Sequence, residues 1–175
     1  MPWMDQVGNL LKQYTGGAAA AAAPAQDVNA HFDQVAAAAP AGTLAAGLAA
    51  AFHSDQTPAF GNMLSGLFAN STGEQKAGLL NQLMANVTPA MLSSIAGGGA
   101  LAGLLKSGGQ ITPEQAQQVS PEAVQQIAAQ AKAANPSIVD SVSNFYAQHT
   151  TLCKTLGGAA LSICLAKVAQ HTQSA

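Results

Sequence analysis

Charge is scarce in this sequence. Asp, Glu, Lys and Arg together make up 8% of its 175 residues, whereas globular proteins carry about 25%. There is no arginine, and the six lysines are scattered rather than clustered. Nucleic-acid binding depends on grouped basic side chains that neutralise phosphates, so we expect no nucleic-acid partner.

Long hydrophobic runs are also missing. The uncharged part of the apolar C-terminal segment, Thr155 to Ala166, is shorter than the roughly 20 residues that cross a bilayer. The N-terminal sequence MPWMDQ carries no early positive charge, so it lacks the pattern of a secretory signal. We therefore expect a cytoplasmic protein without a transmembrane segment.

Aromatic residues are few, at 5%, and no run of alternating β-branched residues indicates a strand. Alanine, leucine and glutamine, which favour helix, dominate instead. Several helix starts are marked by a capping residue followed directly by proline, a combination that suits the free amides of a first turn. These pairs are Thr57-Pro58, Thr88-Pro89, Thr112-Pro113, Ser120-Pro121 and Asn135-Pro136. Ser71 with Glu74 and Thr112 with Gln115 further predict capping boxes.

The C-terminal segment from Leu152 to Val168 is apolar around most of its circumference, which is typical of a helix surrounded by protein. The sequence therefore predicts an all-α fold, a compact bundle of about eight to ten short helices around this buried C-terminal helix. Gly157 and Gly158 lie inside it, and two glycines cost a helix about 2 kcal/mol relative to alanine. We expect close packing of another helix backbone to offset that cost; the alternative is that the helix breaks there.

A tract of glycine and alanine from Gly16 to Ala25 separates the first helix from the rest of the chain. Residues 1–25 are predicted to form an N-terminal amphipathic helix and this linker, and residues 26–175 a single helical domain. Met4, Val7, Leu10, Leu11 and Tyr14 share one face of the first helix. Whether that helix docks on the domain or remains a mobile arm is left open.

Residues that could carry catalysis are not grouped along the chain. The four histidines fall in different predicted elements, and most carboxylates lie in first helical turns, where they favour the helix dipole. The chain has neither a nucleophile elbow nor a phosphate loop. We therefore expect no enzyme and no catalytic, cofactor-binding or metal site. Clustering of His53, Asp55 or His149 with a carboxylate in one cleft would reverse this expectation.

The two cysteines, Cys153 and Cys164, are separated along the predicted C-terminal helix. In a continuous helix their spacing corresponds to roughly 16 Å, beyond the reach of a disulfide. We expect two buried, reduced thiols, with pairing between chains as the minor alternative.

One segment, from Phe60 to Met84, combines phenylalanine, methionine and leucine at helical spacing. Because methionine-rich faces adapt to varied partners or apolar ligands, this is the candidate apolar interaction face; the alternative is that these side chains fill the core. Its residues are Phe60, Met63, Leu64, Leu67, Phe68, Leu80 and Met84.

These features favour a non-catalytic helical protein that acts through protein interaction or self-association, by its N-terminal helix or by the face just defined. The alternative is an apolar-ligand protein that holds a lipid or fatty acid in a cavity between helices with small side chains. An enzyme is the third hypothesis.

Two stretches, MDQVGNLLKQYTGG near the N-terminus and ITPEQAQQ with the later VQQIAAQA and NPSIVDSV, are similar to the YidB-like family of small bacterial helical proteins. The resemblance covers about half the chain and leaves out Thr43 to Val87 and the apolar C-terminal segment. It implies a compact helical fold and a bacterial source. It implies no activity, since we know of none established for that family.

Overall fold

Helix-favouring residues do form helices in this protein. The computed structural model describes residues 2–15, 25–95, 101–103, 106 and 108–174, and within these ranges it contains helices and turns but no strand. The predicted all-α fold class is therefore confirmed. The linker predicted from Gly16 to Ala25 falls almost wholly outside the described residues.

Contacts between residues group the chain into two compact units, where the sequence suggested one domain beginning at residue 26. Unit 1 consists of Met1–Thr57 and Ser143–Ala175, and unit 2 consists of Pro58–Val142. The boundary expected after residue 25 does not appear in this grouping, because the first helix packs within unit 1.

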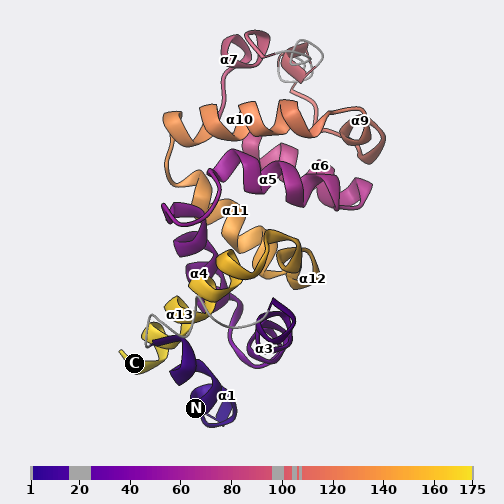
Figure 1. Ribbon diagram of the computed structural model, residues 1–175. Coiled ribbons are helices and arrows are strands. Elements are labelled where there is room, and N and C mark those ends of the chain that lie inside the picture. The colour runs from indigo at the N-terminus through magenta and orange to yellow at the C-terminus, as the bar shows by residue number, and fades with distance from the viewer. Residues whose placement is uncertain (1, 16–24, 96–100, 104–105, 107, 175) are drawn as a thin grey trace. The chain divides into compact units, whose positions relative to one another are not determined.

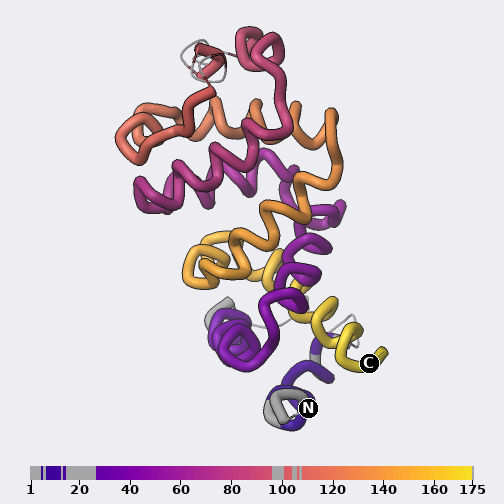
Figure 2. The backbone as a smooth tube through the Cα atoms, turned by 180° about the vertical axis from the view of Figure 1, so that it is seen from behind, coloured from indigo at the N-terminus to yellow at the C-terminus, as the bar shows by residue number. Residues whose placement is uncertain are grey.

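Unit 1 is built from both ends of the chain. Its helices are α1 (Pro2–Thr15), α3 (Ala25–Ala38), α4 (Ala41–His53), α12 (Thr150–Cys153), the 3₁₀ turn η1 (Lys154–Leu156) and α13 (Gly158–Gln173). Helix α13 packs against α4, α1 and α3 (Figure 2). Its side chains Leu161, Leu165 and Val168 are fully buried. The C-terminal helix is thus buried within this unit, whereas the sequence predicted that it would be the centre of one bundle formed by the whole domain.

The C-terminal segment is nevertheless broken, so the prediction of one continuous helix from Leu152 to Val168 is wrong. Gly157 adopts a φ of +90°, a conformation that side chains with a Cβ rarely take. The break divides the segment into α12 with η1 on one side and α13 on the other. Leu156, just before the break, is only half-buried, and so is Ile163 in α13.

Unit 2 is built from α5 (Phe60–Ala69), α6 (Gly73–Met84), α7 (Pro89–Ser93), α9 (Pro113–Gln117) and α10 (Pro121–Ala134). Helix α10 lies along α5 and also contacts α6, while α6 packs against α9 (Figure 1). Helix α11 (Ile138–Ala147) begins in unit 2 and ends in unit 1.

Three of the expected cap–proline pairs begin helices as predicted. The side chains of Thr88, Thr112 and Ser120 accept backbone N–H bonds at the starts of α7, α9 and α10, each with proline in the first turn. Asn135 instead opens a turn, because its side-chain oxygen accepts from the Ser137 N–H at 3.2 Å.

The Thr57 prediction is wrong, because α5 starts later, at Phe60. The Thr57 hydroxyl instead donates toward the carbonyls of Ala51 and Ser54, at 2.7 and 3.0 Å, where α4 ends. It therefore provides a hydrogen-bond donor for carbonyl groups at the end of α4 and does not cap the start of α5.

One capping box lies where it was predicted and the other is displaced by one residue. Thr112 and Gln115 form the expected box of α9. For α6 the box consists of Thr72 and Gln75 rather than Ser71 and Glu74.

A side-chain amide anchors the loop before α9 to α6. The Asn81 oxygen accepts from the Ile111 N–H at 2.9 Å, and the Asn81 amide nitrogen donates to the Ile111 carbonyl at 3.3 Å. Ile111 itself is only 3% exposed, so its backbone groups depend on this side chain.

We expect Asn81→Ala to lower the free energy of unfolding by about 1–3 kcal/mol, because it leaves buried backbone groups of Ile111 without partners. Asn81→Asp keeps the acceptor and loses the donor, so its loss should be smaller at neutral pH. Urea unfolding followed by circular dichroism measures both. Equal losses for the two variants would contradict a role for the Ile111 N–H bond.

Candidate interaction surface

The candidate apolar interaction face is not a surface. Phe60, Met63 and Met84 are 3%, 5% and 4% exposed, and the four remaining members of the set are fully buried. The face predicted from the sequence is therefore the core of unit 2, which α10 covers where it packs on α5 and α6. The alternative interpretation, that these side chains fill the core, is the one that the burial favours.

Lysine side chains lie over two rings of this core. The Lys76 ammonium is 5.1 Å from the centroid of the Phe68 ring, and the Lys132 ammonium is 5.8 Å from that of Phe60. Both distances allow a cation–π attraction. The aliphatic stems of these lysines also cover apolar surface that water would otherwise reach.

Close helix packing occurs at glycines for which the sequence did not predict it. A Cβ on Gly157 would meet nothing within 4 Å, so the helix break, not close approach, accounts for this residue. On Gly47 of α4 a Cβ would lie 2.7 Å from Sγ and 2.8 Å from the carbonyl oxygen of Cys164 in α13. On Gly61 of α5 it would lie 2.6 Å from the carbonyl oxygen of Gln125 in α10. These two glycines let the helix pairs α4–α13 and α5–α10 approach closely.

Both thiols are buried and held in the protonated state. Burial raises the pKa of Cys153 to about 12, against a smaller opposing effect of its backbone hydrogen bond. Burial, with a smaller contribution from the nearby Cys153, raises the pKa of Cys164 still further. The Cys153 thiol donates to the Tyr146 carbonyl at 3.4 Å. Because the thiolate is the nucleophile, neither cysteine is suited to nucleophilic chemistry.

The separation of roughly 16 Å between the two cysteines assumed an unbroken helix, and the helix is interrupted at Gly157 between them. Both cysteines are nevertheless free and buried, as expected.

Raised thiol pKa values make the stability of the protein depend on alkaline pH. Unfolded thiols ionise near pH 8.5, whereas the native thiols stay neutral until much higher pH. The stabilisation from burying them is therefore complete below about pH 8.5 and is lost as pH rises toward the native pKa. We expect each thiol to lower the free energy of unfolding by at most about 1.4 kcal/mol per pH unit in that range.

Urea unfolding between about pH 8 and 11 measures this dependence. The double variant Cys153→Ala with Cys164→Ala should lose stability with pH less steeply than the parent chain. In the native parent chain at pH 8, a thiol reagent should react with neither cysteine. Identical slopes, or fast labelling of the native chain, would contradict the prediction.

Helix α1 is docked in unit 1, where it contacts α13 and α3. Among the side chains of α1 that the structure describes, Val7, Leu11 and Tyr14 are buried, each at most 3% exposed. The Tyr14 hydroxyl lies 2.7 Å from Nδ1 of His31 in α3, and it donates to that atom when the ring carries its proton on Nε2. The two rings also meet edge to face, with centroids 5.8 Å apart. Burial, and secondarily the charge of Asp27, raises the pKa of Tyr14, so the hydroxyl keeps its proton.

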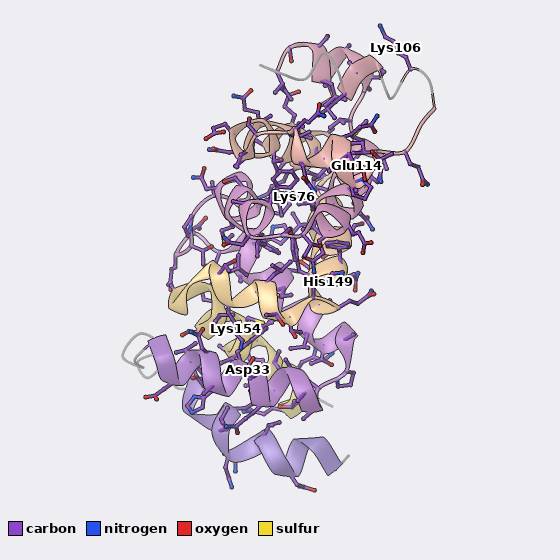
Figure 3. All side chains as sticks on the ribbon, turned by 90° about the vertical axis from the view of Figure 1, so that its right-hand side faces the viewer. Asp33, Lys76, Lys106, Glu114, His149 and Lys154 are labelled. Atoms are coloured by element: carbon purple, nitrogen blue, oxygen red, sulfur yellow. The ribbon has the colours of Figure 1, made fainter. Side chains whose placement is uncertain are left out.

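Other titratable groups of unit 1 lie at or near its surface. Lys154 of η1 and Asp33 of α3 form an ion pair of 2.6 Å and point toward one another in Figure 3. Their side chains are 35% and 51% exposed, so the pair contributes at most about 1 kcal/mol. His53 and Asp55 are exposed, and the ring of His149 lies against that of Phe145 at 4.8 Å.

Two further findings concern metal binding and membrane spanning. Among the described residues, no group of three or more His, Cys, Asp or Glu side chains is placed to hold a metal ion. Within the same ranges, none of the helices has both the length and the apolar character to cross a bilayer.

On the exposed part of unit 2, uncharged amide side chains outnumber charged ones. On α10, Gln125 and Gln126 are exposed beside Glu122 and Ala129. Across the described residues of unit 2, exposed amide side chains outnumber exposed charged side chains. The amides are Asn62, Asn70, Gln82, Gln110, Gln117, Gln118, Gln125, Gln126 and Asn135. The charges are Glu74, Lys106, Glu114, Glu122 and Asp140. We call the exposed side of α10, from Glu122 to Ala133, the α10 amide face.

Some of these amides already link elements of unit 2 to one another. The Gln125 side chain donates to the Asn62 oxygen of α5. The Asn135 amide donates to the Asn86 oxygen at 2.8 Å. A side-chain amide has two donor hydrogens and an acceptor with two lone pairs, so each retains capacity for another partner. This surface was not predicted from the sequence, although the glutamine-rich segment Pro121–Ala134 could have indicated it.

These observations define an all-α protein with two helical units and, among its described residues, no cluster of metal ligands. Neither a protein-family model, nor a curated protein sequence, nor a solved structure matches the chain.

Proposed function

We propose that this chain is a non-catalytic helical module that acts through protein–protein contact. The observation that carries the proposal is the surface of unit 2, where exposed amides outnumber exposed charges and which includes the α10 amide face. Amides can pair with a partner's backbone or side chains without the large desolvation cost that charges incur. Interface cores are depleted in Lys, Glu and Asp in the same way.

The chain's low charge supports the same proposal. A net charge of −2 with 8% charged residues gives little of the repulsion that keeps a surface free of partners. The resemblance to the YidB-like family and a cytoplasmic location belong to this proposal as expectations.

The alternative, an apolar-ligand protein, finds less support in the packing. It requires space beside small residues, but at Gly47 and Gly61 the neighbouring helices occupy that space, to within 2.7 and 2.6 Å of a Cβ position. We therefore give the protein-contact function precedence.

Site-directed photo-crosslinking in cells tests the proposal. A photoreactive residue at Ala129, on the α10 amide face, should give a defined protein adduct, whereas the same residue at exposed Ala30 of α3 serves as the control. Adding the charges of Gln125→Glu and Gln126→Glu should reduce the Ala129 adduct at least about tenfold, because two carboxylates would have to be desolvated. No adduct at Ala129, or an adduct that the charged variant leaves unchanged, would refute the α10 amide face as the contact surface.

A further inference from the structure

Gln125 is anchored at two points although it is exposed on the α10 amide face. Its amide nitrogen donates to the side-chain oxygen of Asn62 in the neighbouring helix α5. Its stem lies against Gly61, because a Cβ added there would be 2.6 Å from the Gln125 carbonyl oxygen and 3.2 Å from its Cγ. The side chain is therefore held both at its stem and at its nitrogen.

This anchoring leaves the Gln125 side-chain oxygen for a partner. The bond to Asn62 uses one N–H of Gln125, and no hydrogen bond among the described residues involves Gln125 Oε1. An amide oxygen accepts two hydrogen bonds. The Asn86–Asn135 pair differs, because Asn135 Oδ1 and Asn86 Nδ2 also bond to backbone groups. Of these two amide pairs, the one at Gln125 has the larger unused capacity.

We propose that Gln125 determines the specificity of the contact made by the α10 amide face, and that Asn62 is its positioning residue. With its nitrogen turned to Asn62, Gln125 presents Oε1 to the partner, which supplies an uncharged backbone N–H from an extended segment. This inference rests on the proposed function and names the chemistry that the partner brings to that surface.

An extended backbone is the occupant that matches these amides. A peptide group carries the same N–H and C=O pair as a side-chain amide, so each complements the other. Inside a helix both backbone groups are already bonded within the chain, whereas an extended segment presents them to a partner.

A lysine or arginine of the partner fits this surface less well. Gln125, Gln126 and Ala129 carry no charge that would compensate a desolvated cation. Glu122 is the one carboxylate of the face, and it lies in the first turn of α10, where it already interacts favourably with the helix dipole.

Anchoring also lowers the cost of binding. A flexible glutamine loses rotamer freedom when a partner fixes it, whereas a side chain already held by Asn62 and Gly61 has less freedom to lose. Gln126 is exposed on the same face without such an anchor among the described residues. Replacing Gln126 should therefore matter less than replacing Gln125.

Nuclear magnetic resonance of the purified full chain tests the positioning step. The ¹⁵N relaxation of the Gln125 side chain should show restricted motion in the parent chain and in Asn62→Asp, which keeps an acceptor oxygen. Motion should increase in Asn62→Leu, and the Gln126 side chain should be mobile in all three proteins. Equal mobility of Gln125 in the parent and in Asn62→Leu would overturn the role of Asn62.

The photo-crosslink at Ala129 tests the specificity step. Gln125→Met keeps the length of the side chain and removes its amide, so it should lower the adduct about five- to tenfold. Asn62→Leu should lower it by a smaller factor, since Asn62 acts through Gln125, and Gln126→Met is the matched control with the smallest loss. These side chains are exposed, so the variants should keep the parent fold. Equal losses for Gln125→Met and Gln126→Met would contradict the inference.

Two further measurements identify the donor. In a lysate, the adduct of the parent chain should persist at about 1 M salt, which screens exposed charges; loss of the adduct would indicate a lysine or arginine instead. In the crosslinked segment of the partner, one position should reject proline, which lacks the N–H, and accept alanine. A position that rejects alanine as strongly would indicate a side-chain donor and overturn the backbone assignment.

The outcomes separate this inference from the proposed function. No adduct at Ala129 in the parent chain would refute the proposed function and the inference with it. An adduct in the parent that Gln125→Met leaves unchanged would refute the inference alone.

Discussion

Replacing Phe68 by alanine is expected to lower the free energy of unfolding by about 3–5 kcal/mol, the range for removing a fully buried aromatic side chain. The Phe68 ring is 0% exposed in the core of unit 2. The variant also removes the ring over which the Lys76 ammonium lies at 5.1 Å. Urea unfolding followed by circular dichroism, with hydrogen exchange at α5 amides to locate the effect, measures the loss.

Phe145→Ala is the matched control, because Phe145 is only half-buried. Its loss should be clearly smaller, although its ring contacts with Tyr146 and His149 also disappear. If Phe68→Ala were nearly neutral for folding but weakened binding to a partner, the segment from Phe60 to Met84 would be an interaction face after all.

The second large effect is expected at Gly61, where alanine should destabilise the protein by about 1–3 kcal/mol. The new methyl group would lie 2.6 Å from the Gln125 carbonyl oxygen. That atom belongs to the backbone of α10, so it cannot move aside as a flexible side chain would. Helices α5 and α10 would have to separate, which disturbs the core between them.

The same substitution at Gly66 provides the internal control. Gly66 lies in the same helix, and a Cβ there would meet nothing within 4 Å. Gly66→Ala should therefore stabilise the protein by about 0.5–1 kcal/mol, through helix propensity alone. Thermal unfolding of the two variants beside the parent chain gives the comparison, and effects of the same sign would contradict the close contact at Gly61.

Local chemistry made much of the fold predictable. Helix propensity gave the all-α class, and hydroxyl–proline pairs placed the starts of α7, α9 and α10, because a cap and its helix are neighbours in sequence. The Thr57 start was wrong because its hydroxyl found the carbonyls of Ala51 and Ser54 instead. A threonine hydroxyl can bond to N–H groups at a helix start or to carbonyl groups at a helix end. The sequence does not show which of these groups lies nearer to the hydroxyl.

Packing between residues far apart in the sequence was harder to predict. Gly157 and Gly47 both interrupt apolar helical sequence, yet one breaks a helix and the other admits Cys164 of α13. The difference depends on which helix lies opposite, which periodicity does not reveal. The Phe60–Met84 stripe reads alike as a core or as a surface, because helical spacing defines a face without identifying what covers it.

The two hydrogen bonds between Asn81 and the backbone of Ile111 affect which insertions the loop before α9 should tolerate. The Asn81 amide bonds to backbone atoms of Ile111, so these hydrogen bonds do not depend on the side chains that precede Ile111. Gly108, Gly109 and Gln110 are exposed just upstream. A foreign peptide grafted over those three positions would therefore be presented from a fixed base, which makes this bend a natural place to display an epitope or a tag.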